Sequence, residues 1–467
     1  MKISCRAIFG SCLLLFLALR QIRGEETPSH RVRISVEVVA IDPAPGIDLI
    51  PRLRAAATRE AAYEEIQQLV DRDAAELLAW PIVTMSDGSD GGARSSYSVR
   101  FPTEFEPPQI PQTFGNTNWP IPPFGFTVPE PGWGAGASAP TAFETRDCGA
   151  KLRATARVIG NGKSVETDLD ASFTRLLGFH EIRNCKDAVG IEGIFPQPEF
   201  QNVTLNPTIR FHDGEHLLAG CSFVQKPAPK IILFLGSARA IDVGPDLTQP
   251  DDGISKTQAA SCRVFAECRM VTLPQKLAIR VINQADTDEA GAWNQVDELL
   301  KSGEAHLTAD LVTLQRNGEQ ATATNMAASR TPTEFEPNQF PRRLPKEQIQ
   351  PAFGSWPVLG MTPTAFSILD TGEAISLEAI VSRNGQSADL KLDVQDSHFL
   401  ESWNCDYAEL PDGKRLALKL PSLQTLQNQI SARVRNGEKI LLGVHKLSNP
   451  EKTFELFFLR LTISAAQ

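Results

Sequence analysis

The chain contains an internal repeat, and this feature constrains its fold most, because a duplicated sequence is expected to fold twice into the same unit. Three motifs occur in the same order in both halves of the 467 residues. The first is identical over six residues, which is hard to obtain by chance. The pairs are PTEFEP at 102–107 and 332–337, PTAF at 140–143 and 363–366 with a glycine six residues later, and DGEHLLAG at 213–220 against NGEKILLG at 436–443.

The spacing of these motifs sets the boundaries of the two units. The offsets are 230, 223 and 223 residues, which a difference in one loop length within a duplicated unit would produce. We therefore predict two tandem homologous domains at residues 30–241 and 262–467. Residues 242–261 contain glycine, proline and few apolar side chains, a composition typical of a linker.

Each unit is predicted to be α+β and mainly β, with one helix followed by mostly antiparallel strands. Residues 31–40 alternate between apolar and other side chains, as a half-buried strand does. Apolar residues recur at three- and four-residue steps over 53–78, which predicts a helix, and a shorter helix is expected around Trp293 and Leu300. Asp-Gly and Asn-Gly turns predict hairpins. The remaining strands are expected at residues 82–85, 95–101, 150–159, 164–174, 204–211, 216–223 and 231–241.

Residues 102–140 differ from the rest because they contain ten prolines and several aromatic side chains. Proline has no N–H to donate to a sheet, so this segment is not expected to form a central strand. We predict a long, ordered loop in an extended conformation. Its aromatic side chains either pack on the body of the protein or contact a partner.

The N-terminus has the pattern of an export signal. Two basic residues precede an apolar run of 13 residues at positions 7–19, which is too short to span a bilayer as a helix. We predict a signal peptide over residues 1–24, with an uncleaved anchor as the alternative. Removal of these residues would leave 42 basic and 56 acidic residues, a balance that argues against nucleic-acid binding.

Six cysteines remain beyond the signal, and none forms a C-x-x-C pair. Zinc sites usually need such tight spacing, so the cysteines do not indicate one. Export permits disulfides, whereas buried thiols are the alternative, and the sequence does not decide between them. The cysteines are Cys148, Cys185, Cys221, Cys262, Cys268 and Cys405.

The search for chemistry finds two motifs and favours a structural reading of both. His212 and His216 lie in a predicted strand–turn–strand, where they would not share the face that two metal-binding histidines on a helix share. A repeated carboxylate pair could act in acid–base chemistry or bind calcium, but its flanking prolines favour a solvent-exposed corner. This pair is Glu104 with Glu106, repeated as Glu334 with Glu336.

No nucleophile elbow, dinucleotide fingerprint or phosphate-binding loop follows a predicted strand. We therefore predict no catalytic, cofactor-binding or metal-binding residues and no enzymatic activity.

The order of the motifs resembles the C-terminal domain of bacterial secretins from type II and type III secretion systems and type IV pili. That family has a valine-rich strand, a helix, a strand with proline and threonine, a strand with spaced Glu, Gly and Leu, and a glycine hairpin before a last apolar strand. The matching segments are 80–84, 143–152 and 213–241 in the first unit, and 309–313, 366–377 and 436–463 in the second. The resemblance implies a secretin-like fold, self-association or protein partners, and a place in the periplasm or outer membrane.

The sequence also departs from that family. Short segments at 227–229 and 449–450 replace a conserved family loop, the proline-rich segment stands where secretins have gate hairpins, and the periplasmic modules of full secretins are missing from it. A pore-lining role therefore does not follow from the resemblance. We expect a non-enzymatic structural component related to secretins that serves protein secretion or pilus assembly. The alternatives are a soluble periplasmic binding or adhesion module and a hydrolase with an unrecognised site.

Overall fold

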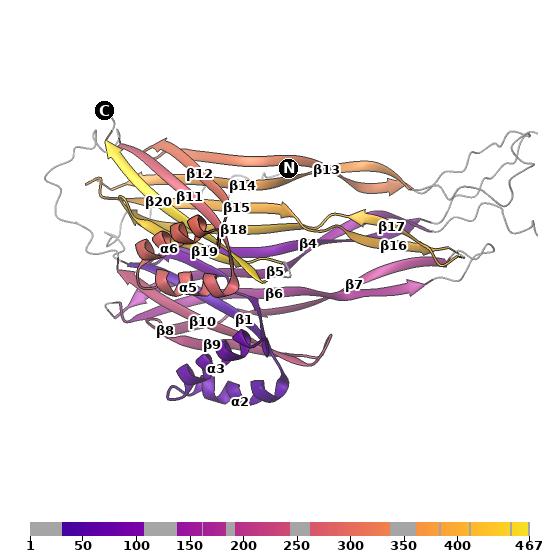
Figure 1. Ribbon diagram of the computed structural model, residues 1–467, viewed down its shortest axis with the longest axis horizontal. Coiled ribbons are helices and arrows are strands. Elements are labelled where there is room, and N and C mark those ends of the chain that lie inside the picture. The colour runs from indigo at the N-terminus through magenta and orange to yellow at the C-terminus, as the bar shows by residue number, and fades with distance from the viewer. Residues whose placement is uncertain are drawn as a thin grey trace, which may run out of the picture.

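The computed structural model describes residues 30–106, 138–160, 162–183, 192–242, 262–336, 361–382, 384–410, 412–448 and 451–465. These residues form two antiparallel sheets and four helices, which confirms the prediction of a mainly β protein (Figure 1). None of the helices among them is long and apolar enough to cross a membrane. The predicted signal peptide and most of the linker lie outside the described residues.

The first half of the chain begins with a strand and two helices and continues with strands. Its elements are β1 (His30–Ile41), α2 (Pro43–Arg54), α3 (Arg59–Asp71), β2 (Ala75–Ala79), β3 (Ile82–Ser86), β4 (Asp90–Glu106), β5 (Ala139–Ile159), β6 (Ser164–Arg183), β7 (Glu192–Leu205), β8 (Thr208–His212), β9 (His216–Val224) and β10 (Lys230–Asp242).

The second half repeats this order. Its elements are β11 (Cys262–Pro274), α5 (Gln275–Ala285), α6 (Glu289–Ser302), β12 (His306–Arg316), β13 (Gln320–Glu336), β14 (Thr362–Val381), β15 (Ser387–Phe399), β16 (Trp403–Glu409), β17 (Arg415–Leu420), β18 (Leu423–Arg435), β19 (Lys439–Lys446) and β20 (Thr453–Ala465).

Both sheets run through both halves. The nine-stranded sheet, called here the short sheet, has the order β12-β11-β20-β19-β3-β1-β10-β9, with β2 also paired to β1. The eleven-stranded sheet, called here the long sheet, has the order β13-β14-β15-β18-β4-β5-β6-β7-β16-β17, with β8 also paired to β6. The two halves therefore do not form separate sheets, and their strands share one structure.

The molecule has three layers, because the strands of the short sheet are buried on both faces. Along β10, Ile231 and Leu233 pack against the helices, whereas Ile232 and Phe234 face the long sheet. Long apolar runs such as β10 and β20 are typical of strands covered on both sides. In the long sheet, buried and exposed residues alternate instead, so one face packs on the short sheet and the other is polar.

The register of the first half recurs in the second. Glu106 pairs with Ala139, and Glu336 pairs with Thr362, at the same offsets of 230 and 223 residues. Both hairpins also have their register shifts at the same positions of the PTEFEP motif. A bulge that recurs in this way is a feature of the fold rather than a defect.

The helical region corrects one prediction. Residues 53–78 form the end of α2, a short connection, α3 and the start of β2 instead of one helix. Asp73 has a positive φ of 58°, a left-handed conformation that Asp tolerates and that ends the helical path after α3. In β2, Ala75, Leu77 and Ala79 are buried alternately, so their spacing had fitted both periods.

The start of the proline-rich segment corrects a second prediction. Residues 102–106 form the end of β4 and pair with β5, although the sequence suggested a loop. The pairing of β4 with β18 covers only residues 91–97, so Pro102 needs no donor on that side. Residues 107–137, with most of the aromatic side chains, lie outside the described residues.

Asn428 connects the two sheets where the halves meet. It lies on β18, and its Nδ2 donates to the carbonyl oxygens of Ile82, at 3.2 Å, and Leu442, at 3.3 Å. Its Oδ1 contacts Nε2 of the buried His445. Burial lowers the pKa of His445 to about 3, so this imidazole is neutral at pH 7. Gly443 makes room, because a Cβ there would lie 2.0 Å from Asn428.

We predict that Asn428→Leu lowers the free energy of unfolding by about 2–4 kcal/mol, because two buried carbonyls and one imidazole would lose a partner. Leucine is the residue at the equivalent position of the first half, Leu205. Urea denaturation measures the change. The control is Gln429→Leu on the exposed face of the same strand, expected within about 0.5 kcal/mol of wild type. Equal stability of both variants would contradict this role.

Candidate assembly edges

The two halves join edge to edge in both sheets. In the long sheet, β18 pairs with β4 over seven residue pairs, from Gln424 with Tyr97 to Ile430 with Gly91. In the short sheet, β19 pairs with β3 through Gly443 with Val83 and the next pair. Strands from the end of the second half thus meet strands from the start of the first half.

The outer edges of the sheets present the counterparts of these junction strands. The short sheet ends at β12, the counterpart of β3, and at β9, the counterpart of β19. In the long sheet, β13 is the counterpart of β4 and pairs with β14 alone among the described strands. The counterpart of β18 is β7 with β8, which pairs with β6 and, at Glu192 and Gly193, with β16. Each outer edge therefore matches a strand that is paired at the junction.

Side chains on β12 differ sharply in exposure from their counterparts on β3. Val312 is 47% exposed and Leu314 is 61% exposed. The same register positions in the first half hold Ile82, which is 1% exposed, and Thr84, which is 0% exposed. The second half covers these two residues at the junction. Two neighbouring apolar side chains on an open edge strand are typical of an interaction surface.

The opposite edges are open only over a limited stretch. On β9, Phe223 is 56% exposed. On β7 and the connection to β8, residues 201–206 contain no proline, whereas Pro198 and Pro207 bracket them. Proline cannot donate to a neighbouring strand, so the prolines restrict pairing to a segment of about the length used at the junction.

A buried ionic cluster supports the junction from the helical side. Arg31 and Arg33 of β1 are buried, and both bond to Glu289 at the start of α6, Arg31 with an N–O distance of 2.7 Å. Glu438 accepts from Arg31 at 2.9 Å. Burial opposes the charge of Arg31, but Glu289 and Glu438 outweigh it and raise the pKa of its guanidinium. Charges from both halves thus neutralise each other across the junction.

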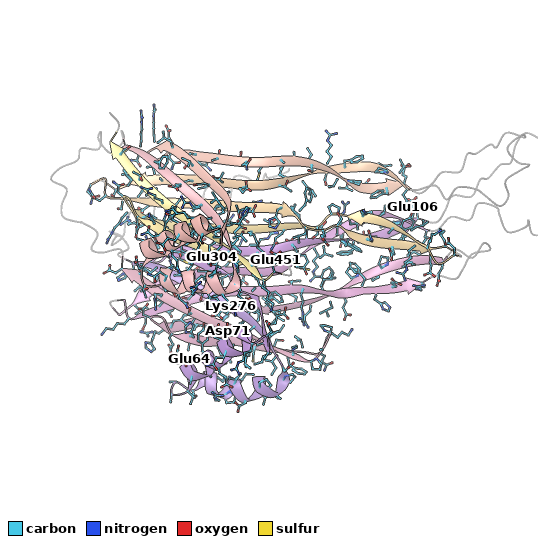
Figure 2. The ribbon with its side chains drawn as sticks, in the orientation of Figure 1. Glu64, Asp71, Glu106, Lys276, Glu304 and Glu451 are labelled. Atoms are coloured by element: carbon cyan, nitrogen blue, oxygen red, sulfur yellow. The ribbon has the colours of Figure 1, made fainter. Side chains whose placement is uncertain are left out.

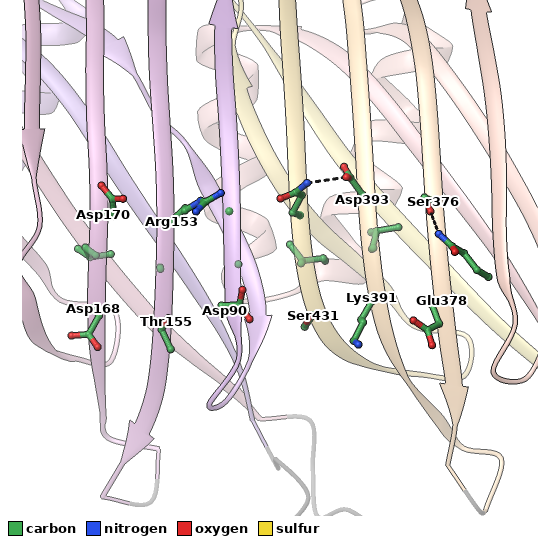
Figure 3. Close-up of a pocket in the computed structure, with 18 residues that line it drawn as sticks. Asp90, Arg153, Thr155, Asp168, Asp170, Ser376, Glu378, Lys391, Asp393 and Ser431 are labelled. Carbon is green, nitrogen blue, oxygen red and sulfur yellow. Dashed lines mark hydrogen bonds between the residues drawn. The ribbon is translucent and has the colours of Figure 1, made fainter. Parts of the chain in front are cut away.

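A polar hollow of about 800 Å³ lies on the long sheet over this junction (Figure 3). Gly91 and Gly92 of β4 leave the space between longer side chains of the neighbouring strands. Acidic groups predominate, and they come from both halves. The charged residues are Asp90, Asp168, Asp170, Glu378 and Asp393 with Arg153 and Lys391. The hollow therefore exists only because the halves are joined.

The repeated carboxylates lie at the outer end of the long strands. Glu104, Glu106, Glu334 and Glu336 are exposed, and Figure 2 shows Glu106 far from the helices. The prediction of a structural corner is replaced by two strand ends, which contact each other through ring stacking of Phe143 on Phe335. The acids themselves point to solvent, as expected.

The two histidines of the first glycine hairpin lie on different strands. His212 is on β8, with Nδ1 3.5 Å from the Ser164 hydroxyl, and His216 is on β9, stacked on Tyr63 at 3.7 Å between ring centroids. Among the described residues, no three His, Cys, Asp or Glu side chains are arranged to hold a metal ion.

Three of the cysteines are buried free thiols. Burial raises the pKa of Cys148 to about 11 and, with the charge of Asp406, that of Cys405 to about 12. Cys268 is fully buried, and its pKa is raised by burial as well. Thiols of this kind are unreactive core side chains. Cys185 lies outside the described residues.

No protein-family model and no curated protein matches the chain. Two solved structures show some similarity. One is the InvG secretin domain beta-barrel from the Salmonella SPI-1 injectisome NC-base, with 11% identity and a TM-score of 0.21, covering 63% of this chain and 88% of that chain. The other is the V. cholerae type IV competence pilus secretin PilQ, with 8% identity and a TM-score of 0.19. That match covers 97% of this chain and 65% of PilQ. Both similarities are low by either measure.

We predict that Glu289→Gln destabilises the protein by about 3–5 kcal/mol, because Arg31 and Arg33 would remain buried with too little compensating charge. Urea denaturation at pH 7 measures the loss. Glu298→Gln, on the exposed face of the same helix, serves as the control and is expected to change little. A Glu289 variant as stable as this control would show that the cluster does not hold the junction.

Proposed function

We propose that this chain is an exported, non-enzymatic structural component related to secretins, which assembles from copies of itself at the periplasm or outer membrane and serves protein secretion or pilus assembly. The order of the secretin-like motifs and their recurrence in both halves support the family relation. The acidic, signal-bearing sequence supports the compartment.

One observation carries the proposal of self-assembly. The outer edges of the two sheets are the counterparts of the strands that already pair at the junction between the halves. Val312 and Leu314 are exposed where their counterparts are buried. A second copy that repeats the junction would cover them. We infer that copies associate head to tail, the first half of one against the second half of the next.

The register of this contact follows from the junction. Transferred by the offsets of the repeat, the pairs of β18 with β4 place residues 201–207 of one copy against residues 321–327 of the next. The pairs of β19 with β3 likewise place Gly220 and Cys221 against Thr313 and Val312. Such a contact is heterologous, so it closes into a ring or continues as a filament.

The test is the assembly state of the chain without residues 1–24, measured by native mass spectrometry and electron microscopy. We expect large assemblies of the wild type. Val312→Lys combined with Leu314→Lys should weaken association by about 100-fold or more, because it would bury two unpaired ammonium groups in the contact.

The matched control is Ile380→Lys on β14, also an exposed apolar residue but away from the free edges. Its counterpart in the first half is Arg157, so a basic side chain fits there. This variant should assemble like the wild type. A wild-type chain that stays monomeric at all concentrations would reject self-assembly and favour the binding-module alternative.

A further inference from the structure

A second cavity lies near the free edges of the second half, between β12, β13, β14 and β15. Its volume is about 560 Å³. Two of its lining side chains, Asp396 and Glu455, are buried. Met326 and Phe399 line it as exposed apolar side chains. The cavity thus combines a buried acidic floor with an apolar rim.

The fold does not require these acids. By register, Asp396 is the counterpart of Phe173, and Glu455 is the counterpart of Ile232. Both counterparts belong to the apolar core of the first half. Placing carboxyl groups at core positions is unfavourable unless they find hydrogen-bond donors or opposite charge. The second half therefore carries a costly feature that its structural twin lacks.

The hydrogen bonds of the cavity leave one acceptor without a donor. Asp396 Oδ2 lies 3.1 Å from His398 Nδ1, and a Glu373 oxygen accepts from Asn325 at 2.9 Å. Glu455 Oε1 has no hydrogen-bond partner among the described residues, although it is buried. Buried acceptors are nearly always paired, so this oxygen indicates a donor that a bound molecule would bring.

The charges around Glu455 determine its protonation. The titratable side chains that line the cavity are His306 of β12, Glu373 of β14, Asp396 and His398 of β15, and Glu455 of β20. Burial, and next the charge of Asp396, raise the pKa of Glu455 well above its ordinary range, so the empty cavity holds a protonated carboxyl at neutral pH. A cation beside both acids would favour the ionised form.

We propose that this cavity binds a cationic nitrogen on an aliphatic stem, either a free alkylamine or a lysine side chain. The ammonium would donate to Glu455 Oε1, to Asp396 and to the hydroxyl oxygen of Thr308, and the stem would lie along Met326 and Phe399. Binding releases the Glu455 proton to solvent, so the product is a carboxylate beside an ammonium. The described acids and imidazoles are not arranged as a metal site, which favours an organic cation.

Isothermal titration of the full chain with n-butylammonium at pH 7, in two buffers of different ionisation enthalpy, tests the proposal. We expect one ligand per chain and about one proton released per ligand. n-Butanol has the same stem without the charge and should not bind. Glu455→Gln should weaken binding at least about tenfold and abolish proton release, because a neutral amide cannot supply the charge.

Glu378→Gln is the matched control, because Glu378 lies on β14 outside this cavity, and its affinity should equal that of wild type. If Glu455→Gln does not fold, the wild-type proton release and the n-butanol titration decide. A lysine-containing peptide that binds more tightly than n-butylammonium identifies a protein side chain as the ligand, and the reverse order identifies a free amine. Absence of binding, equal affinity of Glu455→Gln, or binding of Ca²⁺ in place of the amine would overturn the proposal.

Discussion

Backbone hydrogen bonding at the sheet edges is the constraint on which the rest of the structure depends. An edge strand has unpaired N–H and C=O groups and must be paired or protected. Within the chain, β18 and β4 satisfy each other, and β19 and β3 do so over two pairs. Glu289 places the start of α6 over the same seam through Arg31 and Arg33. This junction fixes the shared core and thereby determines which edges stay open.

The sequence predicts much of each half but little of how the halves meet. The repeat, the hairpin turns and most strands follow from local patterns, because alternation and Asp-Gly turns act within a few residues. The division between α3 and β2 does not, since the apolar spacing at Leu77 fits both periods. Pairing of β18 with β4 joins residues more than 300 positions apart, and no local signal specifies it. Val312 and Leu314 look like any buried strand residues in the sequence, so their exposure was not predictable.

Comparison of the two halves shows that backbone register changes less than the chemistry of the buried polar groups. In the first half, the buried Glu37 accepts from Tyr63 and Gln67 of α3. The counterpart of Glu37 is Arg269, which stacks on Trp293 and bonds to an aspartate of α6. The charge is reversed, while a strand residue still meets two positions of the same helix. The acids Asp396 and Glu455 follow the same rule, because they occupy core positions without altering the strands. The repeat alignment is the signal that could have singled them out.

The prolines near the outer edge explain how an open sheet can accept one partner and refuse others. Pro198 and Pro207 bracket the segment that is free to pair, so a strand in another register would face missing donors. A second copy in the register of the junction avoids them except at its last pair, Pro207. Each copy would then repeat, at its outer edges, the rotation that relates its own two halves. A closed assembly built in this way contains two repeat units per chain, so its number of units is even whatever its size.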